Sequence, residues 1–419
     1  MTLSCLPAPP DTHTGRARRI ALYSHDTQGL GHVRRNIALA SALLAAEPNT
    51  DVLLLTGAPE ATTLPLPPRT DVITLPTLCK DASGRYTART LGAPLGELLA
   101  LRSAMLTATL TAFAPDLLVV DKVARGVDGE LDAALLRLRH SATSVVLGLR
   151  EVLDTPEVVR GEWQAGRTAE AVRDLYDAVW VYGDRDVYDL VTDCELPAEV
   201  AAKTSYTGYL GHGRGVGARL RSRSVPRVAP PTGPYVLCLV GGGQDGLELA
   251  DVFARAPLPG GHEGVVLTGP YMRREGREAL RRAARTTPGM SVVEFVPDAE
   301  RFVAGAAAVV SMAGYNSVCE LLTAGKRTLL VPRTTPRAEQ LLRARSLARR
   351  GLVDVLDPHL ADPRRLAAWT SAAVLAGPPL GRPVDLGGLA RVPRLAAALM
   401  ADRAGTAATH PRGLADVAV

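Results

Sequence analysis

Apolar runs alternate with helical periodicity along the first half of the chain. Val33, Ile37, Ala40 and Leu44 recur at the spacing of an α-helix, and residues 95–113 also read as a helix. Short apolar runs bounded by polar residues lie between such segments, at residues 20–24, 52–56, 72–78, 117–121, 145–149 and 179–182. Continuous apolar strands separated by helices predict an α/β fold, with a parallel sheet that helices cover on both faces.

The same alternation restarts in the second half of the chain. Apolar strands are predicted at residues 235–240, 265–268, 292–296, 309–312 and 328–331, and a basic amphipathic helix at residues 337–350. Between the halves, residues 211–233 are rich in Gly, Arg, Ser and Pro. We therefore predict a linker, residues 213–233, between two Rossmann-like domains at residues 19–212 and 234–380. Residues 1–18 are expected to form a flexible tail.

The length of the chain supports two domains, and its composition indicates the kind of cellular environment and partner. A chain of 419 residues is too long for one ordinary core, and its 47% hydrophobic and 22% charged content is normal for a soluble protein. The net charge of +5 is modest, and no basic stretch is interleaved with aromatic residues, so no nucleic-acid partner is expected. The five cysteines are scattered, which favours a reducing cytoplasm. No apolar run is long enough for a transmembrane helix or a signal peptide.

Residues 311–320, Ser-Met-Ala-Gly-Tyr-Asn-Ser-Val-Cys-Glu, combine a buried strand, a glycine turn and a helix start. The free N–H groups at such a helix start attract a phosphate, and Gly314, Tyr315, Asn316 and Ser317 would surround it. We expect Glu320 on the first turn, where it accepts hydrogen bonds from ribose hydroxyls. The alternative is structural: Asn316 or Ser317 caps the helix, and the acid stabilises its dipole.

Residues 241–246, Gly-Gly-Gly-Gln-Asp-Gly, follow a predicted strand and precede an apolar helix. This is the context of a phosphate-binding turn, in which glycines let the backbone approach a charged ligand closely. The alternative is a tight strand-to-helix turn that binds nothing. We predict that this turn contacts the donor, through Gly241, Gly242, Gly243, Gln244 and Asp245.

Several of these segments resemble the donor site of family 28 glycosyltransferases, in the family's order. Residues 29–32, Gly-Leu-Gly-His, resemble its first glycine loop, and residues 241–246 resemble its second. Residues 294–296 resemble the segment whose backbone reads the base, and Glu320 lies where the family has its ribose-binding glutamate. The resemblance extends over about residues 234–350.

Two further segments extend the resemblance. Glu339 and Gln340 lie where the family has a Gln-Gln pair that touches the sugar, and the change to Glu leaves the identity of the sugar open. Residues 23–27, Tyr-Ser-His-Asp-Thr, resemble the opening of a group of uncharacterised bacterial glycosyltransferases.

The resemblance implies a GT-B fold, in which two Rossmann-like domains with parallel sheets face each other across a cleft. The C-terminal domain would hold a nucleotide-diphosphate sugar, with UDP as the favoured nucleotide. Val296 would contact the base and Arg333 a phosphate. The resemblance also implies a C-terminal helical segment, residues 381–403, that crosses back to the N-terminal domain. The candidate helix within it is residues 393–400, with Pro393 in its first turn. Residues 404–419 are expected to be a tail.

The first glycine loop carries the expected chemistry. Glycosyl transfer needs a base that takes the proton of the acceptor hydroxyl, and a histidine beside an acid is suited to this. His32 matches the loop histidine of the family and is the first candidate, with His25 and Asp26 next. The structural alternative is that these side chains only order the loop and cap the following helix.

The acceptor side is expected at the ends of other strands in the N-terminal domain. Ligands of parallel sheets bind at the carboxyl ends of the strands, so we predict an acceptor side formed by Gly29, Gly31, Asp121, Lys122, Arg150 and Glu151. Residues 184–186, Asp-Arg-Asp, resemble a metal motif of another glycosyltransferase class with a different fold. We therefore expect neither a metal nor another cofactor, and expect dipoles, amides and arginines to stabilise the leaving diphosphate.

These features predict a cytoplasmic glycosyltransferase, of the hexosyl- or hexosaminyl-transferase class, that inverts the anomeric centre. The acceptor would be a small molecule or lipid-linked, and bears a hydroxyl or an amine. Membrane contact is not favoured, because residues 95–113 read more readily as a buried helix than as a membrane-surface helix. A nucleotide-sugar epimerase or hydrolase on the same scaffold, and a non-catalytic nucleotide-sugar-binding protein, are the alternatives. The sequence does not indicate the oligomeric state.

Overall fold

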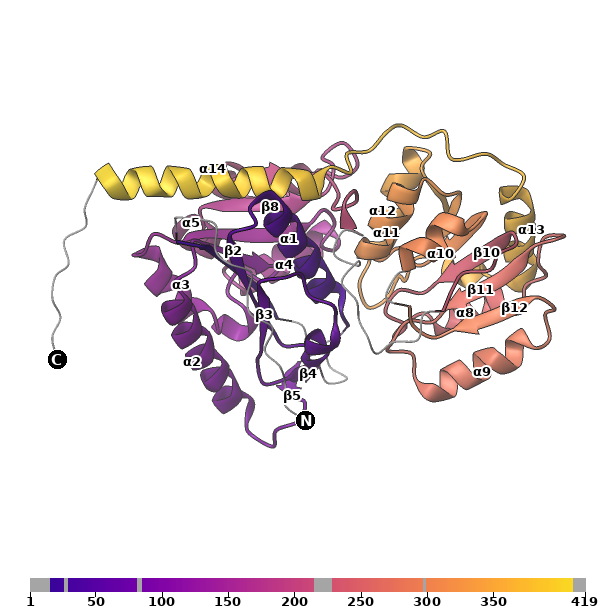
Figure 1. Cartoon of the computed structure of the whole chain (residues 1–419), viewed down its shortest axis with the longest axis horizontal. Helices are drawn as coiled ribbons and strands as arrows, with labels where there is room; N and C mark the ends of the chain where they lie inside the picture. Colours follow the sequence, from indigo (N-terminus) through magenta and orange to yellow (C-terminus); the bar gives the residue numbers. More distant parts are fainter. Residues whose placement is uncertain (1–15, 26–28, 81–84, 215–227, 297–298, 410–419) are drawn as a thin grey trace.

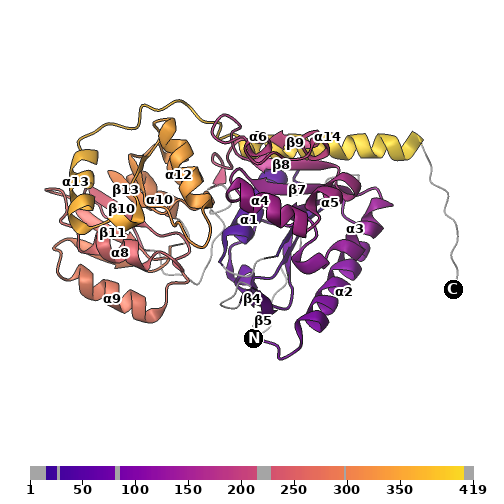
Figure 2. The same ribbon diagram turned by 180° about the vertical axis from the view of Figure 1, so that it is seen from behind.

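The computed structural model describes residues 16–25, 29–80, 85–214, 228–296 and 299–409. They form two α/β domains side by side, with the last helix lying along the first domain (Figure 1). Figure 2 shows the same arrangement from behind. No helix in these ranges is both long and apolar enough to cross a bilayer.

The N-terminal domain is built on a parallel sheet in the order β3-β2-β1-β6-β7-β8-β9. The order reverses between β1 and β6, which is the topological switch point of a Rossmann-like sheet. The strands are β1 (Arg18–Ser24), β2 (Thr50–Thr56), β3 (Thr70–Thr74), β6 (Leu117–Asp121), β7 (Ser144–Arg150), β8 (Ala178–Tyr182) and β9 (Thr204–Tyr206).

Helices cover both faces of this sheet because its strands are apolar on both sides. Along β1, Ile20 and Leu22 pack in the core under α1, whereas Ala21 and Tyr23 pack in the core under α2 and α3. The helices of this domain are α1 (Gly31–Ala46), η1 (Pro59–Thr63), α2 (Leu95–Phe113), η2 (Val127–Gly129), α3 (Asp132–Arg139), α4 (Pro156–Ala165), α5 (Thr168–Leu175), α6 (Leu190–Asp193) and α7 (Ala198–Ala201).

The C-terminal domain repeats the plan with the sheet order β12-β11-β10-β13-β14-β15. Its strands are β10 (Tyr235–Leu239), β11 (Glu263–Leu267), β12 (Met290–Val293), β13 (Ala308–Ser311), β14 (Thr328–Leu330) and β15 (Asp354–Val355). Its helices are α8 (Leu247–Ala254), α9 (Arg274–Ala284), α10 (Ala299–Gly305), α11 (Tyr315–Ala324), α12 (Glu339–Arg349), η4 (Pro358–Leu360) and α13 (Pro363–Ala373). The predicted fold class, two Rossmann-like domains with parallel sheets, is confirmed.

One predicted strand is wrong. Residues 72–78 do not form one strand, because β3 ends at Thr74 and a separate antiparallel hairpin follows, β4 (Leu78–Lys80) with β5 (Tyr86–Ala88). The apolar run continues through Leu75, which is buried outside the sheet. Apolar character therefore indicated burial here but did not indicate where the strand ends.

The last helix, α14 (Gly388–Thr409), leaves the C-terminal domain and packs on the N-terminal one (Figure 1). Leu389, Val392 and Ala396 join the core under α1. Arg403 Nη1 donates to Asp177 Oδ1 at 2.7 Å. The helix differs from the prediction at both ends. It begins at Gly388, so Pro393 lies in its second turn, and it continues through residues 404–409, which were expected to be tail.

Candidate functional site

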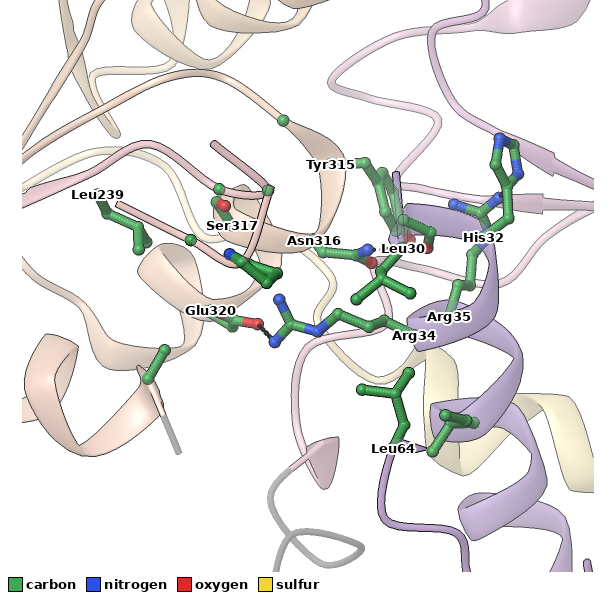
Figure 3. Close-up of a pocket in the computed structure, with 18 of the residues that line it drawn as sticks. Leu30, His32, Arg34, Arg35, Leu64, Leu239, Tyr315, Asn316, Ser317 and Glu320 are labelled. Atoms are coloured by element: carbon green, nitrogen blue, oxygen red, sulfur yellow. Dashed lines mark hydrogen bonds and ion pairs between the residues drawn. The ribbon is translucent and has the colours of Figure 1, made fainter. Parts of the chain in front are cut away.

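A cleft of about 900 Å³ lies between the two domains, at the switch points of both sheets. The start of α1 contributes to one wall, and the turns after β10 and β11 and the starts of α11 and α12 contribute to the other. Figure 3 shows Leu30, His32 and Arg34 on one side and Ser317 and Glu320 on the other. Of the predicted residues, those lining the cleft are Gly31, His32, Arg150, Gly241, Gly242, Val296, Gly314, Tyr315, Asn316, Ser317, Glu320, Arg333, Glu339 and Gln340.

The start of α11 opens into this cleft. Gly314 is the N-cap in an extended conformation, so no side chain occupies the capping position. The first amide bonded within the helix is that of Val318, which donates to Gly314 O at 2.9 Å. The amides of Tyr315, Asn316 and Ser317 precede it and have no carbonyl to bond within the helix. An oxyanion that enters the cleft meets these amides and the positive end of the helix dipole.

The turn after β10 lies against α11 and requires glycine. Gly243 has φ +89°, and a Cβ on it would lie 2.1 Å from Thr268 O. Gly269, on the neighbouring turn, has φ +73°, and its Cβ would lie 2.3 Å from Gly241 O. Two backbone segments therefore touch without side chains between them. Gly241 and Gly242 face the cleft, whereas Gly243, Gln244 and Asp245 do not line it.

Glu320 lies deeper in α11 than predicted. The helix begins at Tyr315, so Glu320 is its sixth residue, in the second turn, and the first turn carries no acid. Its carboxylate still lines the cleft. Across the cleft, Arg34 Nη2 donates to Glu320 Oε1 at 3.0 Å (Figure 3). A ribose hydroxyl that takes the place of this donor at Oε1 must therefore displace Arg34.

Asn316 also bridges the two domains. Its Nδ2 donates to Gly31 O at 2.9 Å, and its Oδ1 accepts from Arg214 Nη2 at 2.8 Å. Sequence analysis did not predict Arg34 or Arg214 at this site. Arg34 lies on the exposed side of the first turns of α1, and nothing in its spacing indicates a partner on α11.

The start of α12 closes the cleft on the side of β14. Arg333 Nη2 donates to Glu339 Oε1 at 2.6 Å, and its Nη1 donates to Asp245 Oδ2 at 3.2 Å. Gln340 Oε1 accepts from the amides of Ala313 and Arg333, at 3.2 and 3.3 Å. Burial alone would raise the pKa of Glu339, but Arg150, Arg333 and Arg343 outweigh it and lower this pKa. Glu339 is therefore a carboxylate that can only accept hydrogen bonds.

Tyr315 lines the cleft, but its ring packs between the domains. The guanidinium of Arg35, from α1, and that of Arg343, from α12, each lie 5.7 Å from its ring centroid. The ring of Tyr209 stacks on it with centroids 6.1 Å apart. Leu210 N donates to its hydroxyl at 3.3 Å. Its side chain therefore serves mainly the interface, while its amide faces the cleft.

His32 pairs with an acid that the sequence analysis placed elsewhere. His32 Nδ1 lies 3.0 Å from Asp121 Oδ2, at the end of β6, and the Arg35 guanidinium also contacts that carboxylate. Asp121 was predicted on the acceptor side, but it is buried and does not line the cleft. Burial raises its pKa, yet Arg35 and His32 outweigh burial and hold the pKa well below its usual range. The carboxylate can therefore orient the His32 ring at any working pH.

Of the other two catalytic candidates, His25 does not line the cleft. His25 is buried beside His32, with ring centroids 4.9 Å apart. Asp26 lies outside the described residues. Among the described residues, His32 is the candidate base that lines the cleft.

The prediction of Glu151 as an acceptor-side residue is wrong. Glu151 Oε1 accepts from Arg343 Nε at 2.6 Å, and both side chains are fully buried. Arg343 belongs to α12, so this ion pair joins the two domains. Asp154 adds a second link, because its Oδ2 accepts from Arg337 Nη1 at 3.1 Å. These acids fix the interface rather than contact a ligand.

Of three further residues predicted on the acceptor side, one lines the cleft and two do not. Arg150, the last residue of β7, lines the cleft. Lys122 and Gly29 do not line it. A Cβ on Gly29 would lie 3.7 Å from Gln244 Oε1, so the two glycine loops meet across the interface. Residues 184–186 form a turn in which Asp184 Oδ2 accepts from the amide of Asp385 at 2.8 Å.

Comparison with known proteins agrees with this arrangement. Residues 249–377 match the Glycosyltransferase family 28 C-terminal domain. The predicted resemblance to family 28 is confirmed. The matched segment contains α11, Arg333, Glu339 and Gln340, and also Val296, which was predicted to contact the base. The predicted donor residues 241–245 precede it.

One curated relative is similar to part of this chain. The UDP-N-acetylglucosamine--N-acetylmuramyl-(pentapeptide) pyrophosphoryl-undecaprenol N-acetylglucosamine transferase of Sorangium cellulosum (strain So ce56) is 33% identical over 108 residues. These residues are 25% of this chain and 27% of the relative. The similarity thus spans about a quarter of the relative's length.

Solved structures match the whole architecture. CalG4, the calicheamicin glycosyltransferase, is 16% identical, with a TM-score of 0.55 over 94% of this chain and 98% of its own. MurG of Acinetobacter baumannii is also 16% identical, with a TM-score of 0.53 over 91% of this chain and 99% of its own. At this identity the likeness concerns the fold, and the fold is GT-B.

Proposed function

We propose that this protein is a glycosyltransferase that moves a sugar from a nucleotide-diphosphate sugar to a hydroxyl or amine of an acceptor. The observation that carries the proposal is the meeting of two features in one cleft. The uncapped start of α11 and the Gly241–Gly242 turn line it from the C-terminal domain, and His32, backed by the buried Asp121, lines it from the N-terminal domain. The family 28 match over residues 249–377 supports the same activity.

The donor would bind on the C-terminal wall. Its diphosphate would accept from the amides of residues 315–317, with Arg333 nearby to neutralise charge. The ribose would donate its hydroxyls to Glu320, and the sugar would contact Glu339 and Gln340 at the start of α12. We take UDP as the nucleotide because the curated relative of this chain is named for a UDP-sugar.

The proposed chemistry is a single displacement. The acceptor oxygen bonds to the anomeric carbon while the bond from that carbon to the β-phosphate oxygen breaks, and the nucleoside diphosphate leaves with the electron pair. His32 Nε2 takes the acceptor proton, while Asp121 holds Nδ1 and stabilises the imidazolium. Base and leaving group belong to opposite walls of the cleft, which favours attack from the far side and inversion. Helix amides and arginines would stabilise the diphosphate without a metal.

The ribose role of Glu320 gives a direct test of donor binding. Calorimetry with UDP and with 2′-deoxy-UDP should give a wild-type preference for UDP of about tenfold, because a charge-assisted hydrogen bond contributes about 1.5–3 kcal/mol. In Glu320→Gln the preference should shrink to about twofold. Glu300→Gln, which changes another carboxylate lining the cleft, is the matched control and should retain it.

Nucleotide binding and turnover without acceptor also distinguish a glycosyltransferase from a hydrolase or an epimerase. If UDP does not bind to the wild type, or if Glu320→Gln keeps the full preference for the 2′-hydroxyl, the donor site is wrong. Where UDP binds, incubation with a UDP-sugar alone distinguishes the alternatives. Rapid UDP release or a new sugar without acceptor would indicate a hydrolase or an epimerase instead.

A further inference from the structure

Arg150 is a cation in the cleft wall to which no carboxylate of the described residues is bonded. It ends β7 and lines the cleft, and its Nε atom is buried. Within the part of the chain that the structure describes, its guanidinium makes no hydrogen bond and no ion pair. A buried guanidinium without a partner is costly, so such a group usually has one.

The carboxylates near Arg150 are already bonded to other arginines. Arg35 is paired with Asp121, Arg343 with Glu151, and Arg333 with Glu339. Burial and the charges of Arg343 and Arg35 together lower the pKa of Arg150 to about 10, although Glu339 and Glu151 act in the opposite direction. The two carboxylates that act on Arg150, Glu339 and Glu151, are thus each bonded to another arginine.

Lys122 adds to this excess from the next strand. It follows β6, and its amide donates to Gly148 O on β7 at 2.8 Å, so it lies near the end of the strand that carries Arg150. Its backbone has φ +69°, a conformation that non-glycine residues adopt at an energetic cost. Among the described residues its ammonium also has no hydrogen-bond or ion-pair partner. Lys122 does not line the cleft, so it can support a ligand on Arg150 through its charge rather than by contact.

We propose that Arg150, supported by the charge of Lys122, binds an oxyanion of the acceptor, a carboxylate or a phosphate, beside the group that receives the sugar. This rests on the proposed function. Arg150 belongs to the N-terminal wall, whereas the phosphate-binding amides of α11 belong to the C-terminal one. Arg35, which contacts His32 and Asp121, is also close to Arg150. An anion on Arg150 therefore lies on the side of the cleft where His32 takes the proton, and a guanidinium can hold it through two parallel hydrogen bonds.

The first test measures thermal stabilisation of the UDP-saturated protein by inorganic phosphate and by acetate, at constant ionic strength. One or both anions should raise Tm in a concentration-dependent way, because a ligand that binds only the folded state stabilises it. Arg150→Met should weaken the apparent anion affinity by about tenfold or more. Arg282→Met, an exposed change of equal charge on α9, is the matched control and should respond like the wild type.

The outcomes distinguish the two sources of the anion. Stabilisation by phosphate alone indicates a phosphorylated acceptor, and stabilisation by acetate alone indicates a carboxylate. Equal stabilisation of wild type and Arg150→Met, or none of either, overturns the proposal. The titration is repeated without UDP so that the two proposals can fail separately. If UDP does not bind, the proposed donor site is wrong. A response to phosphate that depends on Arg150 in the absence of UDP would still support the anion site.

The second test locates the anion. A crystal of the UDP complex soaked in sodium selenate should give an anomalous selenium peak within hydrogen-bond distance of the Arg150 guanidinium. The peak should be missing in Arg150→Met. A UDP phosphate on Arg150, or selenate only at surface positions, would mean that Arg150 serves the donor or no ligand at all, and either result contradicts the proposal.

Discussion

Lys122 holds its positive charge beside two other cations. Burial and the charges of Arg150 and Arg337 together lower its pKa to about 8, while Glu162 and Glu339 act in the opposite direction. The unfolded chain has an ordinary lysine pKa of about 10.4. Between these two values the unfolded state binds more protons than the folded state, so the free energy of unfolding rises with pH.

This sign gives a measurable pH dependence. Denaturant unfolding of the wild type should show greater stability at pH 9.5 than at pH 7.5, relative to Lys122→Met. The variant should also be the more stable protein at pH 7.5, since it removes the uncompensated charge. A parallel pH dependence in the two proteins would show that Lys122 is not the group responsible.

The His32–Asp121 pair is the residue-scale centre of the proposed chemistry. His32→Ala should lower kcat by about 10²–10⁴-fold, the usual contribution of a general base, while the Kd for UDP stays within about twofold. Asp121→Asn should lower kcat as well, because the ring loses its orienting carboxylate. Single-turnover rates and calorimetry on the same preparations provide both numbers. A parallel loss of UDP binding in His32→Ala would assign the histidine to the donor instead.

At the scale of elements, the glycine turns shape the donor wall. Gly243→Ala should destabilise the protein by about 1–3 kcal/mol, because φ is positive and the new Cβ meets Thr268 O. Gly260→Ala, where an added Cβ meets nothing within 4 Å, should change stability by less than about 0.5 kcal/mol. Urea unfolding curves of the two variants make the comparison. If Gly243→Ala and Gly260→Ala destabilised the protein equally, the close contact between the two turns would not be what requires glycine at residue 243.

The elements themselves were largely predictable. Apolar runs such as residues 117–121 became buried strands, and residues 95–113 became α2 over the same range, because periodicity and burial are local properties of the chain. The glycine turns were predictable for the same reason. The length of α14 and the break after Thr74 were not, since packing against the N-terminal domain and hairpin formation decide them.

The side-chain pairs of the site were not predictable. Arg34 and Glu320 are 286 residues apart, and His32 and Asp121 are 89 apart. Strand-end position indicated that Asp121 and Glu151 lie near the cleft, but not that one faces His32 and the other Arg343. The domain contact decides which way each carboxylate turns, and the sequence pattern contains no record of it.

At the scale of the whole molecule, buried ion pairs join the domains. Glu151 and Arg343 are both fully buried at the interface. Glu151→Gln should destabilise the protein by about 3–5 kcal/mol, because it leaves the arginine buried without its partner. The double variant Glu151→Met with Arg343→Met should lose much less. Calorimetric unfolding of both tests this, and a double variant that loses as much as the single would contradict it.

The architecture as a whole follows from two repeats of one plan. Each sheet reverses its strand order at a switch point, and the two switch points face the same cleft. One domain supplies amides and Glu320, and the other supplies His32, Asp121 and Arg150. The activity we propose requires both halves, which agrees with the tight links made by Arg343 and by α14.

The central claim is that the start of α11 binds the diphosphate of a nucleotide whose ribose binds Glu320. A crystal structure of the UDP complex tests it most directly. The account predicts phosphate oxygens within hydrogen-bond distance of the amides of residues 315–317, ribose hydroxyls on the Glu320 carboxylate, and Arg34 displaced from that carboxylate. UDP bound elsewhere, or Glu320 still paired with Arg34 in the complex, would contradict it.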